Sequence, residues 1–129
     1  MSISGKAYSV SDPHMQAVTA ASMTEEDFLV ILSYSGSTKD NIYTAKIARQ
    51  AGAGIGCITR FQKSPLSAYC DVVLQCGANE GPMEGGSVSA KIGQMYLIDL
   101  LYQEYWRRNY ETSRKYRENA SKAVMDKLY

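Results

Sequence analysis

The sequence predicts an α/β protein whose parallel sheet lies between helices. Short apolar runs of strand length recur at 28–32, 54–59 and 71–76. The segments between and after them carry apolar residues at helical spacing or end in turn-forming residues. Strands that alternate with helices favour parallel pairing and right-handed crossovers. We therefore expect a three-layer α/β/α sandwich, formed as a single domain over residues 1–129, with a helical tail at the carboxyl end.

The first elements follow from alternation and capping. Lys6–Ser11 alternates weakly and predicts a short strand. Asp12 is a good N-cap and Pro13 suits the first position of the helix that follows. A polar turn at Thr24–Asp27 then leads into five consecutive apolar residues, Phe28–Leu32. An uninterrupted apolar run of this length predicts a parallel strand that is buried on both faces.

A hydroxyl-rich loop follows this strand and leads into the next helix. Four hydroxyl residues surround Gly36, namely Ser33, Ser35, Ser37 and Thr38. The helix is predicted by the stripe Ile42, Ala45, Ile47 and Ala48, and Gly52 is placed to end it. Backbone amides at a helix N-terminus and the positive end of its dipole favour anions, so the loop predicts a phosphate site. The alternative is that a single hydroxyl only caps the helix.

The second half of the chain continues the pattern. Strands are expected at Gly54–Thr59 and Asp71–Cys76, with a turn or short helix beginning at Ser64-Pro65. A glycine-rich loop at 77–86 then precedes a long helix that opens at Ser87. The broad apolar face of this helix suits core packing or contact between subunits, and it is formed by Ile92, Met95, Tyr96, Ile98, Leu101, Tyr102 and Tyr105. The polar tail, 111–129, predicts one more helix on the surface or facing another subunit.

Composition excludes several classes of protein. The 129 residues carry a formal net charge of +1, which gives no electrostatic footprint for nucleic acid or an anionic membrane. No apolar run approaches the roughly 20 residues of a membrane span, and the first residues lack the apolar core of a signal peptide, so we expect a cytoplasmic location. Cys57, Cys70 and Cys76 match no zinc spacing and are expected to be reduced, buried thiols. We expect no metal and no cofactor.

Four segments together resemble a known family. They are YSVSDPHMQAVTAAS, ILSYSGSTKD, CITRFQKSPLSAYCDVVL and EGGSVSAKIGQMYLIDLLY. They resemble the sugar isomerase (SIS) domain, flavodoxin-like in fold, of RpiR/MurR-type bacterial transcriptional regulators. The resemblance implies that Ser33, Ser35, Gly36, Ser37 and Thr38 bind the phosphate of a phosphosugar. It also places His14, Glu84 and Ser87 in segments that line the same crevice in relatives, and it implies a homodimer or higher oligomer.

The sequence departs from that family in two ways, which bear on DNA binding and on the completeness of the sheet. The regulators carry a helix-turn-helix domain ahead of the SIS domain, and no basic recognition helix is present here, so we expect no direct binding to nucleic acid. The resemblance also implies that this sequence lacks a counterpart of the first strand and helix of the SIS fold. The chain is then a fragment, a naturally short product, or a subunit whose open sheet edge is filled by another chain. We expect oligomer contacts through this edge and the C-terminal helices.

The remaining question is whether the domain senses a sugar or transforms it. An aldose-ketose isomerase needs an acid-base group close to the reacting carbons. His14 is the only histidine, and only Asp12 and Glu84 stand out as carboxylates to assist it. In the isomerase relatives a Glu and a His occupy the helix that His14 opens, whereas here Gln16, Ala17 and Val18 follow. We therefore expect a non-catalytic sensor. The alternatives are a phosphosugar isomerase, with His14 and Glu84 as catalytic candidates, and an oligomerisation module without ligand.

Overall fold

The computed structural model describes residues 7–77, 88–125 and 127. In chain order its elements are α1 (Pro13–Ala21), β1 (Phe28–Leu32), α2 (Lys39–Gln50), β2 (Gly54–Thr59), the 3₁₀ turn η1 (Ser67–Tyr69), β3 (Val72–Gln75), α3 (Val88–Arg108) and α4 (Tyr110–Met125). They form two compact units. One runs from Val10 to Leu97 and holds the sheet, and the other contains the helical segment from Ile98 onward.

The three strands form one parallel sheet in the order β1-β2-β3. In the middle row Val30 pairs with Gly56, and Gly56 pairs with Val72. Because the strands are parallel, their carboxyl ends meet at one edge, which is where open α/β sheets bind ligands. The α/β class and the parallel sheet predicted from the sequence are confirmed.

Local chemistry explains where the helices begin and end. Asp12 Oδ1 accepts a hydrogen bond of 2.8 Å from the backbone N–H of Met15, and Pro13 occupies the first turn of α1, as predicted. At the end of α2, Gly52 adopts a φ of +89°, a conformation that glycine enters without strain. The carboxylate of Asp27 closes the turn before β1 by accepting from the N–H and the hydroxyl of Thr24.

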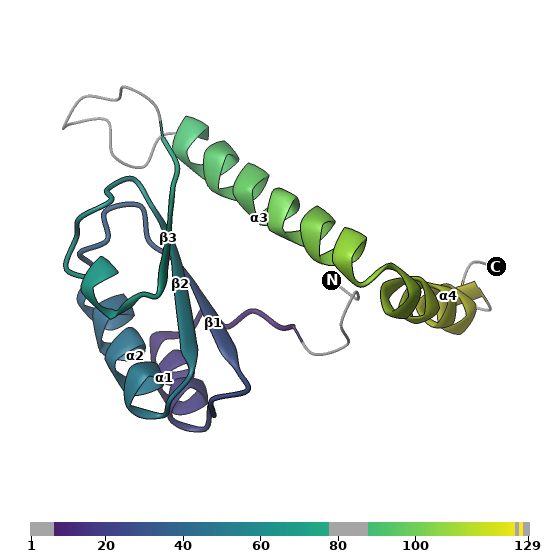
Figure 1. Ribbon diagram of the computed structural model, residues 1–129, viewed down its shortest axis with the longest axis horizontal. Helices are drawn as coiled ribbons and strands as arrows, with labels where there is room; N and C mark the ends of the chain where they lie inside the picture. The colour runs from purple at the N-terminus through teal and green to yellow at the C-terminus, as the bar shows by residue number, and fades with distance from the viewer. Residues whose placement is uncertain (1–6, 78–87, 126, 128–129) are drawn as a thin grey trace. The chain divides into compact units, whose positions relative to one another are not determined.

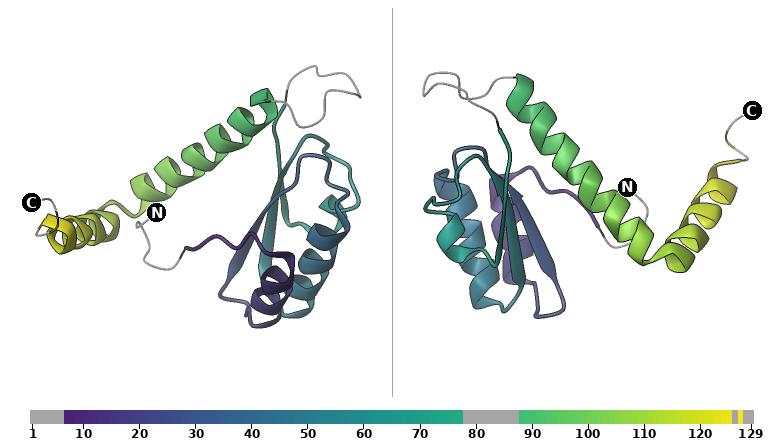
Figure 2. Two further views of the ribbon diagram at one scale, coloured as in Figure 1. Left: turned by 180° about the vertical axis from the view of Figure 1, so that it is seen from behind. Right: turned by 45° about the horizontal axis from the view of Figure 1, so that its top comes forward.

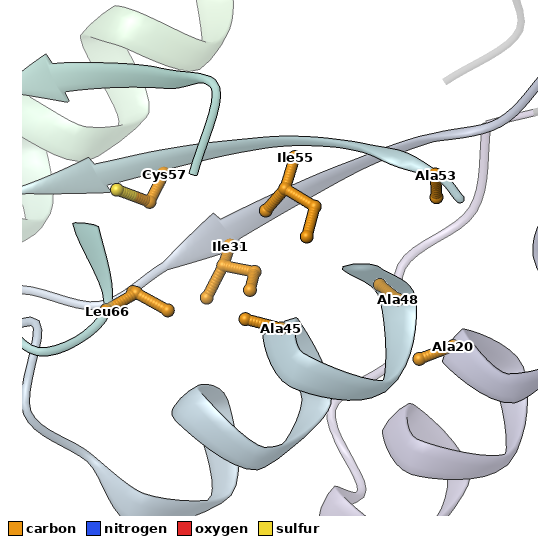
Figure 3. Packing of buried hydrophobic residues seen from close by; sticks show 8 residues of the cluster. All are labelled: Ala20, Ile31, Ala45, Ala48, Ala53, Ile55, Cys57 and Leu66. Atoms are coloured by element: carbon orange, nitrogen blue, oxygen red, sulfur yellow. The ribbon is translucent and has the colours of Figure 1, made fainter. Parts of the chain in front are cut away.

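The core lies between the sheet and the helices α1 and α2, which run side by side over one face of it (Figures 1 and 2). Ile31 from β1 and Ile55 from β2 point toward Ala45 and Ala48 of α2 (Figure 3), and Cys57 of β2 belongs to the same buried cluster. Ala20, Ala53 and Leu66 complete the cluster. Alanine on the facing surfaces lets the two helices and the strands approach closely, so that small side chains form a dense core.

Two sequence predictions about the strands are wrong. The described part of the first predicted strand, residues 7–11, joins no sheet. The carbonyl of Val10 instead accepts a hydrogen bond of 2.8 Å from the side-chain amide of Gln16 in α1. Strand β1 is also not buried on both faces, because Phe28, Val30 and Leu32 are exposed on the face that α1 and α2 do not cover. Its alternate residues point to opposite faces, and only the inner set meets the helices.

The helices α3 and α4 confirm the predicted long helix and helical tail, although Ser87 lies outside the described residues. The apolar face that the sequence predicts on α3 is largely exposed to solvent within the single chain, and its exposed residues include Ile92, Met95 and Tyr96. Hydrogen bonds from Arg107 and Arg108 hold the pKa of the partly exposed Glu104 carboxyl at about 2. Over the described ranges, no helix combines the length and the apolar character needed to span a bilayer.

Candidate functional site

The hydroxyl-rich segment forms the loop between β1 and α2, at the edge where the carboxyl ends of the strands meet. The backbone N–H of Ser33 continues the sheet pairing by donating to the carbonyl of Ile58 at 3.0 Å. The chain then turns, and the N–H of Gly36 donates to the carbonyl of Ser33 at 3.2 Å. Gly36 adopts a φ of +64°, so the turn depends on a residue without a Cβ.

The exposed hydroxyls of the loop lie in the residues that lead into the first turn of α2. Ser35 Oγ accepts hydrogen bonds from both the backbone N–H and the hydroxyl of Ser37, at 3.3 and 3.0 Å. Thr38 is the N-cap residue, and its side chain makes no capping hydrogen bond. The purely structural alternative, in which these hydroxyls serve to cap the helix, is therefore not supported at Thr38. Hydroxyls and helix-terminal amides gathered in this way can donate to an anion.

The first turn of α2 contributes backbone dipoles rather than net side-chain charge to this helix end. Lys39 and Asp40 open α2 with opposite charges, and both are exposed. Their formal charges cancel, so side chains of the first turn add no net charge for an anion. The aligned peptide dipoles and the N–H groups of the first turn supply the positive potential.

The loop rests on the segment that follows β2. The carbonyl of Tyr34 accepts from the backbone N–H of Arg60 at 2.9 Å and from Thr59 Oγ1 at 3.1 Å. The carbonyl of Gly36 accepts from the N–H of Leu66 at 2.9 Å. A Cβ built on Gly36 would lie 2.3 Å from Ser64 Oγ, so the turn is packed tightly against this support.

Sequence reasoning did not assign Thr59, Arg60 or Ser64 to the site. The signal was present, since Thr59 and Arg60 stand at the carboxyl end of a predicted parallel strand. Arg60 also brings a positive charge to this edge. Its guanidinium carbon lies 6.0 Å from the ring centre of Tyr34 and 5.3 Å from that of Phe61, which is within cation–π range.

Ser33 differs from the other predicted hydroxyls. Its residue is 5% exposed, and its Oγ has no hydrogen-bond partner among the described residues. Alternation along β1 places Ser33 on the same side as Ile31, toward the core. Ser35, Ser37 and Thr38 are exposed, while Gly36 is buried beneath them. Contact between Ser33 and a ligand stays a prediction.

The remaining predicted residues lie away from these contacts or outside the described chain. His14 is exposed in the first turn of α1, the helix that packs on α2. Asp12, considered as its partner, uses Oδ1 to cap α1 through Met15. Within the described ranges no hydrogen bond joins His14 to the loop. Glu84 and Ser87 lie outside the described residues, so their predicted roles stay untested.

Other chemistry at the described residues is limited. The three cysteines are free thiols, and burial together with Cys57 raises the pKa of the Cys70 thiol to about 12. A thiol with so high a pKa is rarely ionised near neutral pH and is a poor nucleophile. The structure, where described, brings no three His, Cys, Asp or Glu side chains together in a way that would hold a metal ion.

Comparison with known proteins gives a family and its relatives. The family model described as SIS domain matches residues 1–103. An HTH-type transcriptional regulator of Haemophilus influenzae is 37% identical over 89 residues, which cover 69% of this chain and 31% of that protein. The HTH-type transcriptional regulator RpiR of Escherichia coli K12 is 31% identical over 100 residues, which cover 78% and 34%.

Solved structures agree with these relatives. The NanR protein of Vibrio vulnificus, complexed with ManNAc-6P, is 29% identical with a TM-score of 0.85, covering 98% of this chain and 47% of that one. The sugar isomerase domain of an RpiR transcription factor from Sphaerobacter thermophilus has a TM-score of 0.69 at 22% identity, over 84% and 58% of the two chains, and supports the fold alone. This chain spans about a third of the length of the two regulators and about half of NanR.

Proposed function

Because the chain belongs to the SIS domain family, we propose that it binds a phosphorylated sugar and acts as the ligand-sensing module of an RpiR-type regulator. Its homologues are RpiR-type transcriptional regulators, which confirms the resemblance found in the sequence. The ManNAc-6P held by the related NanR protein supports a phosphosugar as the class of ligand. The proposal places the phosphate on the loop between β1 and α2.

One observation carries the assignment of the site. Thr38 caps α2 by its backbone position, yet its hydroxyl makes no capping bond. Together with the exposed hydroxyls of Ser35 and Ser37, it offers donors at the positive end of α2. In the proposed complex the phosphate accepts hydrogen bonds from these hydroxyls and from the amides around Gly36. The sugar extends toward His14, Glu84 and Ser87.

The proposed module binds its ligand without transforming it. Isomerisation requires a base within hydrogen-bond reach of the reacting carbon. His14 is the only histidine of the chain, and Asp12, the carboxylate closest to it in sequence, is engaged in capping α1. The test is incubation of the protein with phosphosugars, followed by separation of aldose and ketose products. Turnover that disappears in His14→Ala would replace this proposal with the isomerase function.

Sensing requires that the ligand favours one arrangement of the protein over another. We propose that the protein is cytoplasmic and that the arrangement that responds to ligand is that of the subunits in a homo-oligomer. The subunits would contact one another through the apolar residues of α3 and the exposed side of β1. On these elements several large apolar side chains are exposed, among them Val30 on β1 and Ile92 and Met95 on α3, and clusters of such side chains are typical of interaction surfaces. In a longer relative, the subunit arrangement would set the spacing of the DNA-reading helices, while this chain itself makes no contact with DNA.

The deciding experiment is a calorimetric titration with ManNAc-6P and a panel of other phosphosugars. Each is run beside its unphosphorylated sugar and beside inorganic phosphate. We expect saturable binding of at least one phosphosugar and much weaker binding of its two controls. A thermal-shift measurement gives a second readout, because a ligand at 100 times its Kd adds about 2.7 kcal/mol of stability. A folded protein that binds none of the panel would refute the proposed function.

A further inference from the structure

Thr59, the last residue of β2, lies directly beneath the candidate phosphate loop. It is fully buried. Its Oγ1 donates to the carbonyl of Tyr34 at 3.1 Å and accepts from the backbone N–H of Phe61 at 3.4 Å. A Cβ built on Gly36 would lie 3.0 Å from the same oxygen. The hydroxyl therefore ties the end of β2 to Tyr34 through a hydrogen bond and packs closely against Gly36.

The groups that would meet a ligand and the groups that support them are different residues. Ser35, Ser37 and Thr38 are exposed. The backbone beneath them is anchored at Tyr34 and Gly36, whose carbonyls accept from Thr59, Arg60 and Leu66. Of these three donor groups, only the one on Thr59 belongs to a side chain. A substitution can therefore remove this hydrogen-bond donor and leave the backbone donors of Arg60 and Leu66 in place.

We propose that Thr59 is a positioning residue for the phosphate loop: its buried hydroxyl holds the backbone of Tyr34–Gly36 in the conformation that receives the phosphate, and it does not touch the ligand. This inference rests on the proposed function. A loop that is already ordered loses less conformational entropy when the ligand binds, and binding is correspondingly tighter. Without the hydroxyl, the Tyr34 carbonyl keeps the hydrogen bond from the Arg60 N–H, while the Phe61 N–H loses the hydrogen bond to Thr59 Oγ1.

The test compares Thr59→Val, which removes the hydroxyl at nearly constant volume, with Thr59→Ser, which retains it. Affinity for the phosphosugar that the wild type binds is measured by calorimetry, well below the melting temperature of each variant. We expect Thr59→Val to bind about tenfold more weakly, because the ligand must then order a loop that the hydroxyl no longer holds, and Thr59→Ser to bind within about threefold of the wild type. If Thr59→Val does not fold, Thr59→Ala removes the same hydroxyl with more room.

Two further readouts separate positioning from general stability. Ile55→Val shortens a fully buried side chain of the same strand away from the loop, and we expect lower stability with wild-type affinity. In Thr59→Val we expect faster amide hydrogen exchange at Ser35–Thr38 in the free protein, with no such change in Ile55→Val. Together these results would support the inference.

The positioning role of Thr59 would be overturned if folded Thr59→Val bound the phosphosugar as tightly as the wild type. It would also be overturned if Thr59→Ser or Ile55→Val lost as much phosphosugar affinity as Thr59→Val. A wild-type protein that binds no phosphosugar would instead refute the proposed function on which the inference rests.

Discussion

At the scale of single residues, the conformation of the phosphate loop requires glycine most clearly at position 36. Its φ of +64° is unfavourable for alanine by about 1–2 kcal/mol. A Cβ would also press on the side chain of Ser64. We predict that Gly36→Ala lowers the free energy of unfolding by at least about this amount and abolishes detectable phosphosugar binding. Urea unfolding and calorimetry measure the two effects.

Gly52 is a matched control for that substitution. Its φ of +89° is also in the left-handed region, but the nearest atom to a built Cβ is 3.8 Å away, on Glu25. Gly52→Ala is expected to lower stability while leaving affinity unchanged, because it strains the end of α2 far along the helix from the loop. If Gly36→Ala also bound phosphosugar like the wild type, the loop would not be the ligand site.

Thr38 allows binding to be separated from stability. Its side chain makes no capping bond, so Thr38→Ala is predicted to change the free energy of unfolding by less than about 0.5 kcal/mol. A charge-assisted bond to phosphate is worth about 1.5–3 kcal/mol, so phosphosugar affinity is predicted to fall roughly 10- to 150-fold. Calorimetry and thermal unfolding measure the two quantities.

The control for Thr38 is Thr24→Ala. The Thr24 hydroxyl bonds to Asp27 in the turn before β1, at the other end of that strand. Its loss should reduce stability and leave affinity unchanged. Phosphosugar affinity in Thr38→Ala that equals the wild-type value would remove Thr38 from the site.

At the scale of secondary-structure elements, Asp71 ties α2, β2 and the start of β3 together. Its Oδ2 accepts from the backbone N–H of Ile55 at 2.8 Å, and its Oδ1 accepts from the guanidinium of Arg49. These hydrogen bonds hold the pKa of the Asp71 carboxyl below its usual value, with Arg49 as the larger cause. The pair is partly exposed, so added salt screens its charge–charge attraction.

This shift predicts a pH dependence of stability. A carboxyl whose pKa is lower in the folded protein stabilises the fold above its unfolded-state pKa of about 3.9, and this contribution is lost as pH falls through the folded pKa. Asp71→Asn is therefore predicted to lower the urea midpoint at pH 7, with the difference from wild type narrowing below about pH 4.

Asp99→Asn, which removes an exposed carboxylate on α3, serves as the control and should leave the urea midpoint at pH 7 nearly unchanged. A difference between wild type and Asp71→Asn that stays constant with pH would contradict the role of ionised Asp71.

At the scale of the whole molecule, exposed apolar side chains predict association between chains. On α3, Met95 and Tyr96 are 68% and 62% exposed. The wild-type protein is predicted to exceed its monomer mass of 14.3 kDa in sedimentation equilibrium. The double substitution Met95→Glu with Tyr96→Glu is predicted to shift it toward monomer, because buried charges of one sign without partners oppose association.

Tyr43→Lys is the matched control, since Tyr43 is an exposed aromatic residue on α2 rather than on α3. It should leave the mass distribution as it is in the wild type. A wild-type protein that sediments as a monomer at high concentration would refute the predicted oligomer.

From α1 onward, the sequence by itself determined the order of the elements and the place of the hydroxyl-rich loop, because these depend on local properties. The apolar run at Phe28–Leu32, the cap at Asp12 and the glycine at position 52 act on neighbouring backbone, and each is found where it was predicted. The SIS family was recognised from the same local segments.

Only the tertiary structure decided what surrounds those elements. Thr59 and Ser64 support a loop more than 20 residues earlier in the chain, a contact that arises from the pairing of β1 with β2. The same pairing turns Ser33 toward the core and leaves Phe28 exposed on the opposite face. A local pattern cannot predict such outcomes, because burial and support depend on which distant segments pack against each side of a strand.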